Sequence, residues 1–202
     1  MADSVSPNAG RLHFQHLCFC SFHNFFVVKG ISYDKNIIDL SEIKENFKRA
    51  LTAKIFSILT IGTLSFLSFK TSFGLFIVGS FGASMVLVFG YPESPFSEPK
   101  NILFGHFFTS LVGVLALNFF PIDQNYLFIQ IAVAVGLGIF VMILLGVTHP
   151  PAGGNPIFII LGGSSYKFLF NPIILGCIII IVYAIILNRF ILKKNYPVSW
   201  NK

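Results

Sequence analysis

The chain has 202 residues, of which 54% are hydrophobic, 16% aromatic and only 11% charged. A soluble globular domain carries about 25% charged residues, so the composition excludes an ordinary soluble domain and predicts an integral protein of the lipid bilayer. The formal net charge of +6 does not indicate nucleic acid as a partner. The Lys and Arg residues cluster at the two ends of the apolar region, where positive charge sets membrane topology.

Residues 1–30 are predicted to be an irregular N-terminal extension. They contain soft metal ligands at short spacing: His13, His16, Cys18, Cys20 and His23. An irregular segment that meets no metal explains these residues more simply, so we predict no metal and no cofactor. A transit peptide is an alternative, because the segment is poor in acids, although its two basic residues are few for one.

Residues 31–50 are polar with a helical period that places Ile37, Leu40, Ile43 and Phe47 on one face. This pattern predicts an amphipathic segment on the membrane surface in front of the first span. A plain soluble linker is the alternative.

Residues 51–192 form the predicted transmembrane domain, an all-α fold of five to six helical segments, and residues 193–202 form a basic tail. The apolar segments are expected at 51–69, 73–90, 102–120, 126–147, 155–163 and 171–192. Positive residues flank the first and the last segment, which predicts both ends on one side and an even number of crossings. Six segments fit, although about nine helical residues cannot cross roughly 30 Å alone.

The charged residues between Ile55 and Asn188 all lie between the expected segments: Lys70, Glu93, Glu98, Lys100, Asp123 and Lys167. Coupling to protons or sodium through a carboxylate therefore has no evident site at mid-membrane. The deep ionisable candidates are His106 and His149. A hydrogen-bonded core histidine is the simpler interpretation of His106, with a proton relay as the alternative.

The stretch GVTHPPAGGNP, residues 146–156, interrupts the apolar sequence. Pro150 and Pro151 lack an N–H, so they are predicted to leave the carbonyls of Gly146 and Val147 without helical partners. The chain is expected to be extended from Thr148 to Pro151. Inside a membrane such a backbone is tolerated only where it is buried in protein or lines a wet cavity, which predicts a site at His149 and Thr148.

A short helix is expected to restart directly after the break. Asn155 is a strong N-cap residue and Pro156 suits the first helical position. The free N–H groups of Gly153 and Gly154 are then predicted to face the gap at the positive end of the helix, where anions bind.

An upstream stretch, FGASMVLVFG, repeats part of this pattern. A shift of about 71 residues pairs Gly82 with Gly153 and Ser84 with Asn155. Ser84 is therefore predicted to cap a second half-helix, and paired interruptions of this kind indicate two inverted repeats with a site between them. A packing face of small residues is the alternative. The candidate substrate-binding residues are His149, Thr148, Gly153, Gly154, Asn155, Gly82, Ser84 and His106, and the break is made by Pro150, Pro151 and Pro156.

Three stretches in order resemble the HPP family of integral membrane proteins: FGASMVLVFGYPESPFSEPKNILFGHFFTSLVGV, THPPAGGNP and NRFILKKNYPVSW. The resemblance covers roughly residues 45–200. Plastid and cyanobacterial members look like nitrite transporters, so it implies transport of a small monovalent anion, nitrite, across a cyanobacterial plasma membrane or a plastid envelope. No Ser–His–Asp set or acid pair lies at depth, and we do not predict an enzyme.

Other functions compete with nitrite transport. The same break suits the passage of another small solute or of protons, and a membrane enzyme or a scaffold ranks lower. The sequence leaves open channel against carrier and whether the protein is a homo-oligomer.

Overall fold

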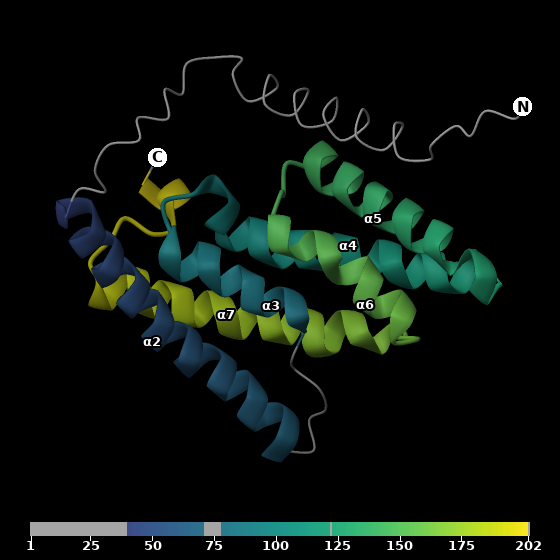
Figure 1. Cartoon of the computed structure of the whole chain (residues 1–202), viewed down its shortest axis with the longest axis horizontal. Helices are drawn as coiled ribbons and strands as arrows, with labels where there is room; N and C mark the ends of the chain where they lie inside the picture. Colours follow the sequence, from purple (N-terminus) through teal and green to yellow (C-terminus); the bar gives the residue numbers. More distant parts are fainter. Residues whose placement is uncertain (1–39, 71–77, 122, 202) are drawn as a thin grey trace, which may run out of the picture. The chain divides into compact units, whose positions relative to one another are not determined.

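The computed structural model describes residues 40–70, 78–121 and 123–201, and these residues form helices and connections without a strand (Figure 1). The all-α fold is therefore confirmed. The predictions for residues 1–30, including those for the histidines and cysteines, fall outside the described residues.

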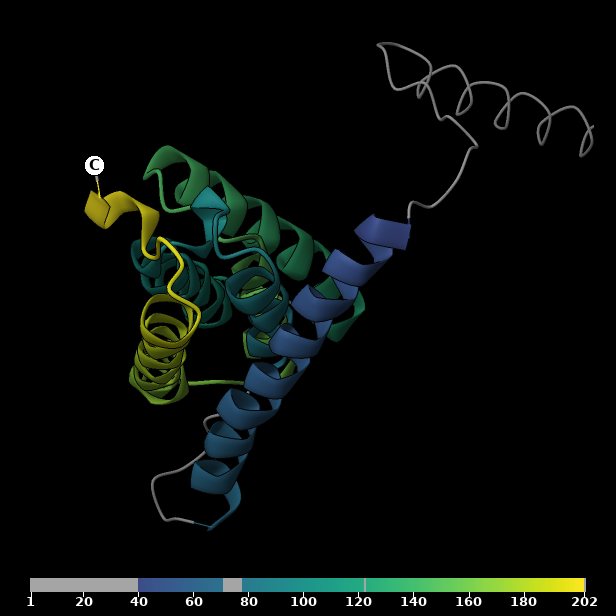
Figure 2. The same cartoon turned by 90° about the vertical axis from the view of Figure 1, so that its left-hand side faces the viewer.

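The first helix, α2, runs without interruption from Leu40 to Lys70. The predicted surface segment therefore continues into the first span, because no proline lies between residues 40 and 70 to end the helix. Only 11% of its apolar window is buried, which fits its place at the edge of the bundle (Figure 2). Ile43 and Phe47 are exposed.

The next two expected segments are helices of unequal length. Helix α3 spans Gly79–Met85 and continues into a π-helical turn, Val86–Gly90. A proline-rich connection follows, with a short 3-10 turn at Pro95–Ser97. Helix α4 spans Pro99–Phe119 and begins on a proline, whose missing N–H needs no partner in a first turn.

The second half of the chain also mixes long and short helices. A 3-10 turn at Gln124–Tyr126 leads into α5, Leu127–Leu144. The break then contains a 3-10 helix, Pro150–Gly154, followed by α6, Asn155–Leu161.

The last membrane segment is one helical run with a π-helical turn at each end. These turns are Leu169–Ile174 and Ile186–Ile191, and α7, Leu175–Ile185, lies between them. A 3-10 turn at Val198–Asn201 closes the described chain.

Among the described residues, four helical runs are long and apolar enough to cross a membrane: residues 41–70, 99–119, 124–144 and 169–191. The α3 run and α6 are shorter. Helix α6 nevertheless runs in the same direction as α4, because Asn155 lies beside His106 while Leu161 shares a cavity wall with Leu117. It therefore reverses the direction of α5, as the prediction of six segments requires.

The beginning of α2 and the end of the last helical run lie on the same side of the bundle. Lys48 and Arg49 line a cavity of about 270 Å³ together with Leu192 and Lys194. The basic residues that flank the first and the last segment therefore gather at one face, which agrees with an even number of crossings.

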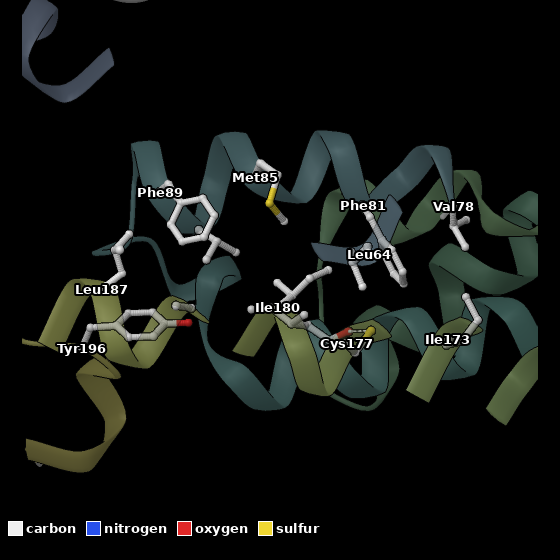
Figure 3. Close-up of a cluster of buried hydrophobic side chains, with 13 residues drawn as sticks. Leu64, Val78, Phe81, Met85, Phe89, Ile173, Cys177, Ile180, Leu187 and Tyr196 are labelled. Carbon is white, nitrogen blue, oxygen red and sulfur yellow. Dashed lines mark hydrogen bonds between the residues drawn. The ribbon is translucent and has the colours of Figure 1, made fainter. Parts of the chain in front are cut away.

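The main apolar core lies between α3 and α7. Figure 3 shows Phe81 above Cys177, Met85 above Ile180 and Phe89 beside Leu187, and all six side chains are buried. Gly176 makes this packing close, because a Cβ atom at that position would overlap the Phe81 ring. Small residues at such contacts let membrane helices approach each other.

A second close approach lies between α4 and the break. A Cβ atom on Gly105 would lie 2.8 Å from the Cβ of His149. Gly105 pairs with Gly176 under the shift of 71 residues, and each glycine receives a segment from the opposite half of the chain. These reciprocal contacts favour the inverted repeat, which stays a prediction.

Candidate functional site

Four polar side chains meet between α3, α4 and the break, and all four are fully buried: Ser84, His106, His149 and Asn155. The Ser84 Oγ lies 3.0 Å from Nε2 of His106 and 2.8 Å from Nε2 of His149. The Asn155 Nδ2 lies 3.0 Å from Nδ1 of His106. We call these four residues the histidine cluster. It joins side chains that lie up to 71 positions apart in the sequence.

Both ends of the histidine cluster fix its hydrogen-bond direction. The Phe96 carbonyl oxygen lies 2.7 Å from Nδ1 of His149, and a carbonyl only accepts, so Nδ1 carries the hydrogen. The amide nitrogen of Asn155 only donates, and the 3.2 Å contact of that nitrogen with the His106 main-chain oxygen holds this orientation of the amide. A neutral imidazole has one donor and one acceptor, so His106 carries its hydrogen on Nε2.

The resulting chain of bonds runs in one direction. Asn155 donates to His106, the Nε2–H of His106 donates to the Ser84 hydroxyl, and that hydroxyl donates to Nε2 of His149. His149 then donates to the Phe96 oxygen. Every ring nitrogen has a partner with both imidazoles neutral, so the two rings need no charge, whereas the buried Oδ1 of Asn155 has no hydrogen-bond partner among the described residues.

The break is held against α4 by main-chain contacts. Asn101 donates from Nδ2 to the oxygens of Pro95 and Thr148, at 2.9 and 3.1 Å. Gly105 leaves the space that the His149 main chain occupies. Asn101 thereby holds two segments, the loop before α4 and the break, against the first turn of α4. This contact positions the His149 ring.

A glycine, and not the prolines of the break, ends α5. Gly146 adopts a left-handed conformation, with φ of 64°. Its N–H bonds to the Ile143 oxygen, and the Val147 N–H bonds to the Met142 oxygen. This pattern is the usual glycine stop of a helix. Gly146 therefore terminates α5 before Pro150 and Pro151 are reached.

The predicted extended run from Thr148 to Pro151 is also too long. His149 is extended, with φ of −132° and ψ of 96°, but Pro150 already begins a 3-10 helix that includes Pro151. Proline suits a first helical turn because its φ is preset and its missing N–H is not needed there.

Asn155 lies inside the helix that it was expected to cap. It has helical dihedral angles, Gly154 occupies the N-cap position, and no side chain caps α6. The amide of Asn155 bonds instead to His106 and, at 2.8 Å, to the Ser110 hydroxyl. Ser84 likewise caps no helix, since it is the sixth of seven residues in α3.

The remaining candidates lie outside the histidine cluster. Gly82 is exposed and lines a cavity of about 450 Å³ between α2 and α3. Gly153 and Gly154 are half-buried, and added Cβ atoms there would meet Ile139 and Phe158 at 3.9 and 3.8 Å. Thr148 contributes its main-chain oxygen to Asn101. The structure therefore brings together Ser84, His106, His149 and Asn155. The side chains or Cα atoms of the other four candidates, Gly82, Thr148, Gly153 and Gly154, are not part of the histidine cluster.

Pro156 packs next to the histidine cluster, on α4. A Cβ atom on Gly113 would lie 2.9 Å from the Cα of Pro156. This close contact seats the first turn of α6, so Pro156 has a packing role that agrees with its predicted place in the break.

Besides Asn101, two hydrogen-bond partners of the histidine cluster, Ser110 and the Phe96 carbonyl, were not predicted from the sequence. Ser110 lies one helical turn beyond His106 and faces Asn155, a position that the spacing of four residues on a helix indicates. The Phe96 carbonyl has no signal in the sequence, because a main-chain oxygen is common to every residue.

The histidine cluster has no ionic partner among the described residues. The nearby carboxylate of Glu98 is bonded elsewhere, by the Ser199 N–H at 3.1 Å and the Ser199 hydroxyl at 2.6 Å. The described residues contain no group of three or more His, Cys, Asp or Glu side chains that could hold a metal. A second apolar cluster joins Val114 of α4, Ile159 of α6 and Leu169.

Comparisons with known proteins give a matching family and several similar proteins. The model of the family described as HPP, transmembrane region, matches residues 42–197. Two transmembrane proteins of Dictyostelium discoideum are similar, one 34% identical over 129 residues and the other 32% over 130 residues. Bax inhibitor 1 of Schizosaccharomyces pombe is 30% identical over 123 residues.

These matches cover 61%, 62% and 53% of this chain and only 45%, 42% and 45% of the three relatives. The chain thus spans less than half the length of the curated relatives it matches. No solved structure matches the chain. The family model covers the whole described membrane region, including the histidine cluster, and the chain belongs to the HPP transmembrane family.

Proposed function

We propose that the protein moves a small monovalent anion, nitrite, across the membrane through the histidine cluster. The observation that carries this proposal is the complete burial of Ser84, His106, His149 and Asn155 in a membrane protein. Polar groups in a membrane interior are expensive to bury and commonly mark a solute path. The resemblance to nitrite transporters of the HPP family supports the choice of nitrite.

The chemistry of the histidine cluster suits a small anion. The imidazole N–H of His106, the Ser84 hydroxyl and the Asn155 amide are hydrogen-bond donors within one small volume. Neutral donors hold an anion less tightly than a fixed Lys or Arg does, and conduction requires binding weak enough for release.

The membrane is proposed to be a cyanobacterial plasma membrane or a plastid envelope. The family resemblance alone carries this location, and expression of a fluorescently tagged chain in the source cell tests it.

Reconstitution of the full chain into vesicles tests the transport proposal. We expect nitrite uptake above that of protein-free vesicles, and roughly tenfold less uptake for His149→Ala, since the change removes a buried hydrogen-bonding group. Thr60→Val is the matched control, because the Thr60 hydroxyl is buried and lacks a partner among the described residues.

Nitrate, formate and chloride complete the series. Uptake of one of these with none of nitrite would contradict the proposed substrate and leave a transporter for another solute. Nitrite uptake by His149→Ala equal to that of the wild type would remove the histidine cluster from the path.

A further inference from the structure

The Ser84 hydroxyl has two acceptors within hydrogen-bond distance. Its Oγ lies 2.8 Å from Nε2 of His149 and 3.1 Å from the main-chain oxygen of Ser80. A hydroxyl has one hydrogen and two lone pairs, so it donates to only one of these acceptors at a time. Rotation about the Cβ–Oγ bond of Ser84 moves only the hydroxyl hydrogen. It therefore changes Ser84 from a hydrogen-bond donor to an acceptor toward His149.

We propose that His149 binds one proton at Nε2 for each anion that passes, so that the protein moves the anion and the proton together. This inference rests on the anion transport proposed above. When the proton binds, Nε2–H donates to the Ser84 Oγ and the Ser84 hydroxyl turns to the Ser80 oxygen. The proton comes from hydronium on one side of the membrane, so an O–H bond of hydronium breaks as the N–H bond forms. On the other side the N–H bond breaks and the proton returns to a water molecule as hydronium.

The protonated state needs no movement of the non-hydrogen atoms. The Ser84 Oγ has two lone pairs, one for His106 at 3.0 Å and one for His149 at 2.8 Å. The Nδ1–H of His149 keeps its bond to the Phe96 oxygen. Both N–H groups of the imidazolium therefore have acceptors, as a buried cation requires.

His106 is not arranged to take the proton. Its Nε2 already carries a hydrogen, and its Nδ1 accepts from the Asn155 amide at 3.0 Å. That amide nitrogen also lies 3.2 Å from the His106 oxygen and 2.8 Å from the Ser110 hydroxyl. A proton on Nδ1 would oppose a donor that three contacts hold in place, so His149 is the proton site.

No charged side chain competes with His149 for this role among the described residues. The elements α3, α5, α6 and the 3-10 helix between them contain no Asp, Glu, Lys or Arg. The other titratable neighbours are bonded elsewhere or exposed: Glu98 accepts from Ser199, Tyr196 donates to the Ser97 oxygen, Cys177 donates to the Ile102 oxygen, and Tyr91, Glu93 and Lys100 are exposed.

Because α3, α5, α6 and the 3-10 helix carry no Lys or Arg and Lys100 of α4 is exposed, binding of the proton to His149 is coupled to binding of the anion. An anion and an imidazolium are each strongly disfavoured when buried alone, and pairing offsets the loss of hydration. No hydrogen bond joins the four side chains of the histidine cluster to a described Lys or Arg. The positive charge that balances a bound anion is therefore the imidazolium of protonated His149. The proton and the anion therefore bind together, and each transport cycle moves no net charge.

The test uses the full chain in vesicles loaded with a pH-sensitive dye, with protein-free vesicles subtracted. A pH gradient, acidic outside, is expected to drive nitrite uptake above equilibrium and to raise internal acidity beyond the protein-free rate. A membrane potential set with potassium and valinomycin is expected to leave uptake unchanged. His149→Gln is expected to lose the response to the pH gradient, and Thr60→Val to keep it.

Two wild-type results separate this inference from the proposed function. Nitrite uptake that responds to the membrane potential and ignores the pH gradient would overturn proton coupling and leave anion transport in place. Absence of nitrite uptake under either gradient would overturn the anion transport itself. Retention of the pH response by His149→Gln would show that the proton binds elsewhere, which also overturns the inference.

Discussion

The Ser84 hydroxyl lies 2.8 Å from Nε2 of His149, a residue 65 positions later in the chain. This contact is the link between α3 and the break, and His106 joins the same hydroxyl from α4. Because the Phe96 carbonyl and the Asn155 amide fix the two ends, each ring has one assigned tautomer. The assignment is directly measurable.

We expect the hydrogen of neutral His149 on Nδ1 and that of His106 on Nε2, since the tautomer follows the hydrogen bond of the other nitrogen. Solid-state NMR of the protein with ¹⁵N-labelled histidine distinguishes the two tautomers, and His106→Gln and His149→Gln assign the signals. The opposite tautomer at His149 would contradict the bond to the Phe96 oxygen.

Gly105 is expected to tolerate no side chain. A Cβ atom there would lie 2.8 Å from the Cβ of His149 and 3.0 Å from the Val147 oxygen. Gly105→Ala should destabilise the protein by about 1–3 kcal/mol, since overpacking shifts main-chain atoms. Unfolding in detergent measures this effect. Gly136→Ala is the control, because no atom lies within 4 Å of its added Cβ, and it should be neutral or stabilising.

The packing of α3 against α7 gives a rescue experiment. An alanine Cβ at Gly176 would overlap the ring of Phe81. Gly176→Ala should lower the melting temperature in detergent, and a second change, Phe81→Leu, should restore part of the loss by making room. Equal destabilisation by Gly176→Ala with and without Phe81→Leu would show that the ring is not the obstacle.

The contact between α2 and α7 includes a hydrogen bond of 2.7 Å between the Thr63 and Tyr183 hydroxyls. A double-mutant cycle with Thr63→Val and Tyr183→Phe should give a coupling of about 0.5–1.5 kcal/mol, the usual net value of one hydrogen bond. The free energy of unfolding is the measurement. Additive effects of the two changes would mean that the bond does not stabilise the docking of α2.

Tyr196 is expected to make stability depend on alkaline pH. Its hydroxyl donates to the Ser97 oxygen at 2.8 Å, and burial, with a smaller contribution from Glu98, raises the pKa of Tyr196 above its ordinary value of 10. The unfolded chain then loses this proton at lower pH than the folded chain, so the stabilisation is complete below pH 10 and declines as pH rises further.

Tyr196→Phe tests that dependence. The change should remove part of the alkaline loss and should itself cost about 1–3 kcal/mol at neutral pH, because the Ser97 oxygen loses its donor. Melting temperatures recorded across alkaline pH measure both effects. Tyr91→Phe is the control, since Tyr91 is 49% exposed. An identical alkaline profile for the wild type and Tyr196→Phe would contradict the assignment.

The apolar sequence was sufficient to predict the membrane class, the helical fold and the presence of five to six helical segments. Long apolar runs must satisfy their main-chain groups internally, and helices do this within one segment. The expected segment 155–163 ends close to α6, which stops at Leu161, because a left-handed glycine, Gly163, follows. Ser84, His106, His149 and Asn155 could be named as candidates because they are polar residues in apolar surroundings. The structure buries all four together, and their role in transport stays a prediction.

The sequence could not assign what these side chains do, because their partners are distant in the chain. The local sequence predicts Asn155 as the N-cap residue of α6, but Gly154 occupies that position. The Asn155 amide bonds instead to His106 and Ser110. Gly82 and Ser84 are two positions apart, yet the helix turns Gly82 outward and Ser84 into the histidine cluster. Which polar groups meet depends on how α3 and the break pack on α4. Buried polar groups need hydrogen-bond partners, and these partners come from distant parts of the chain.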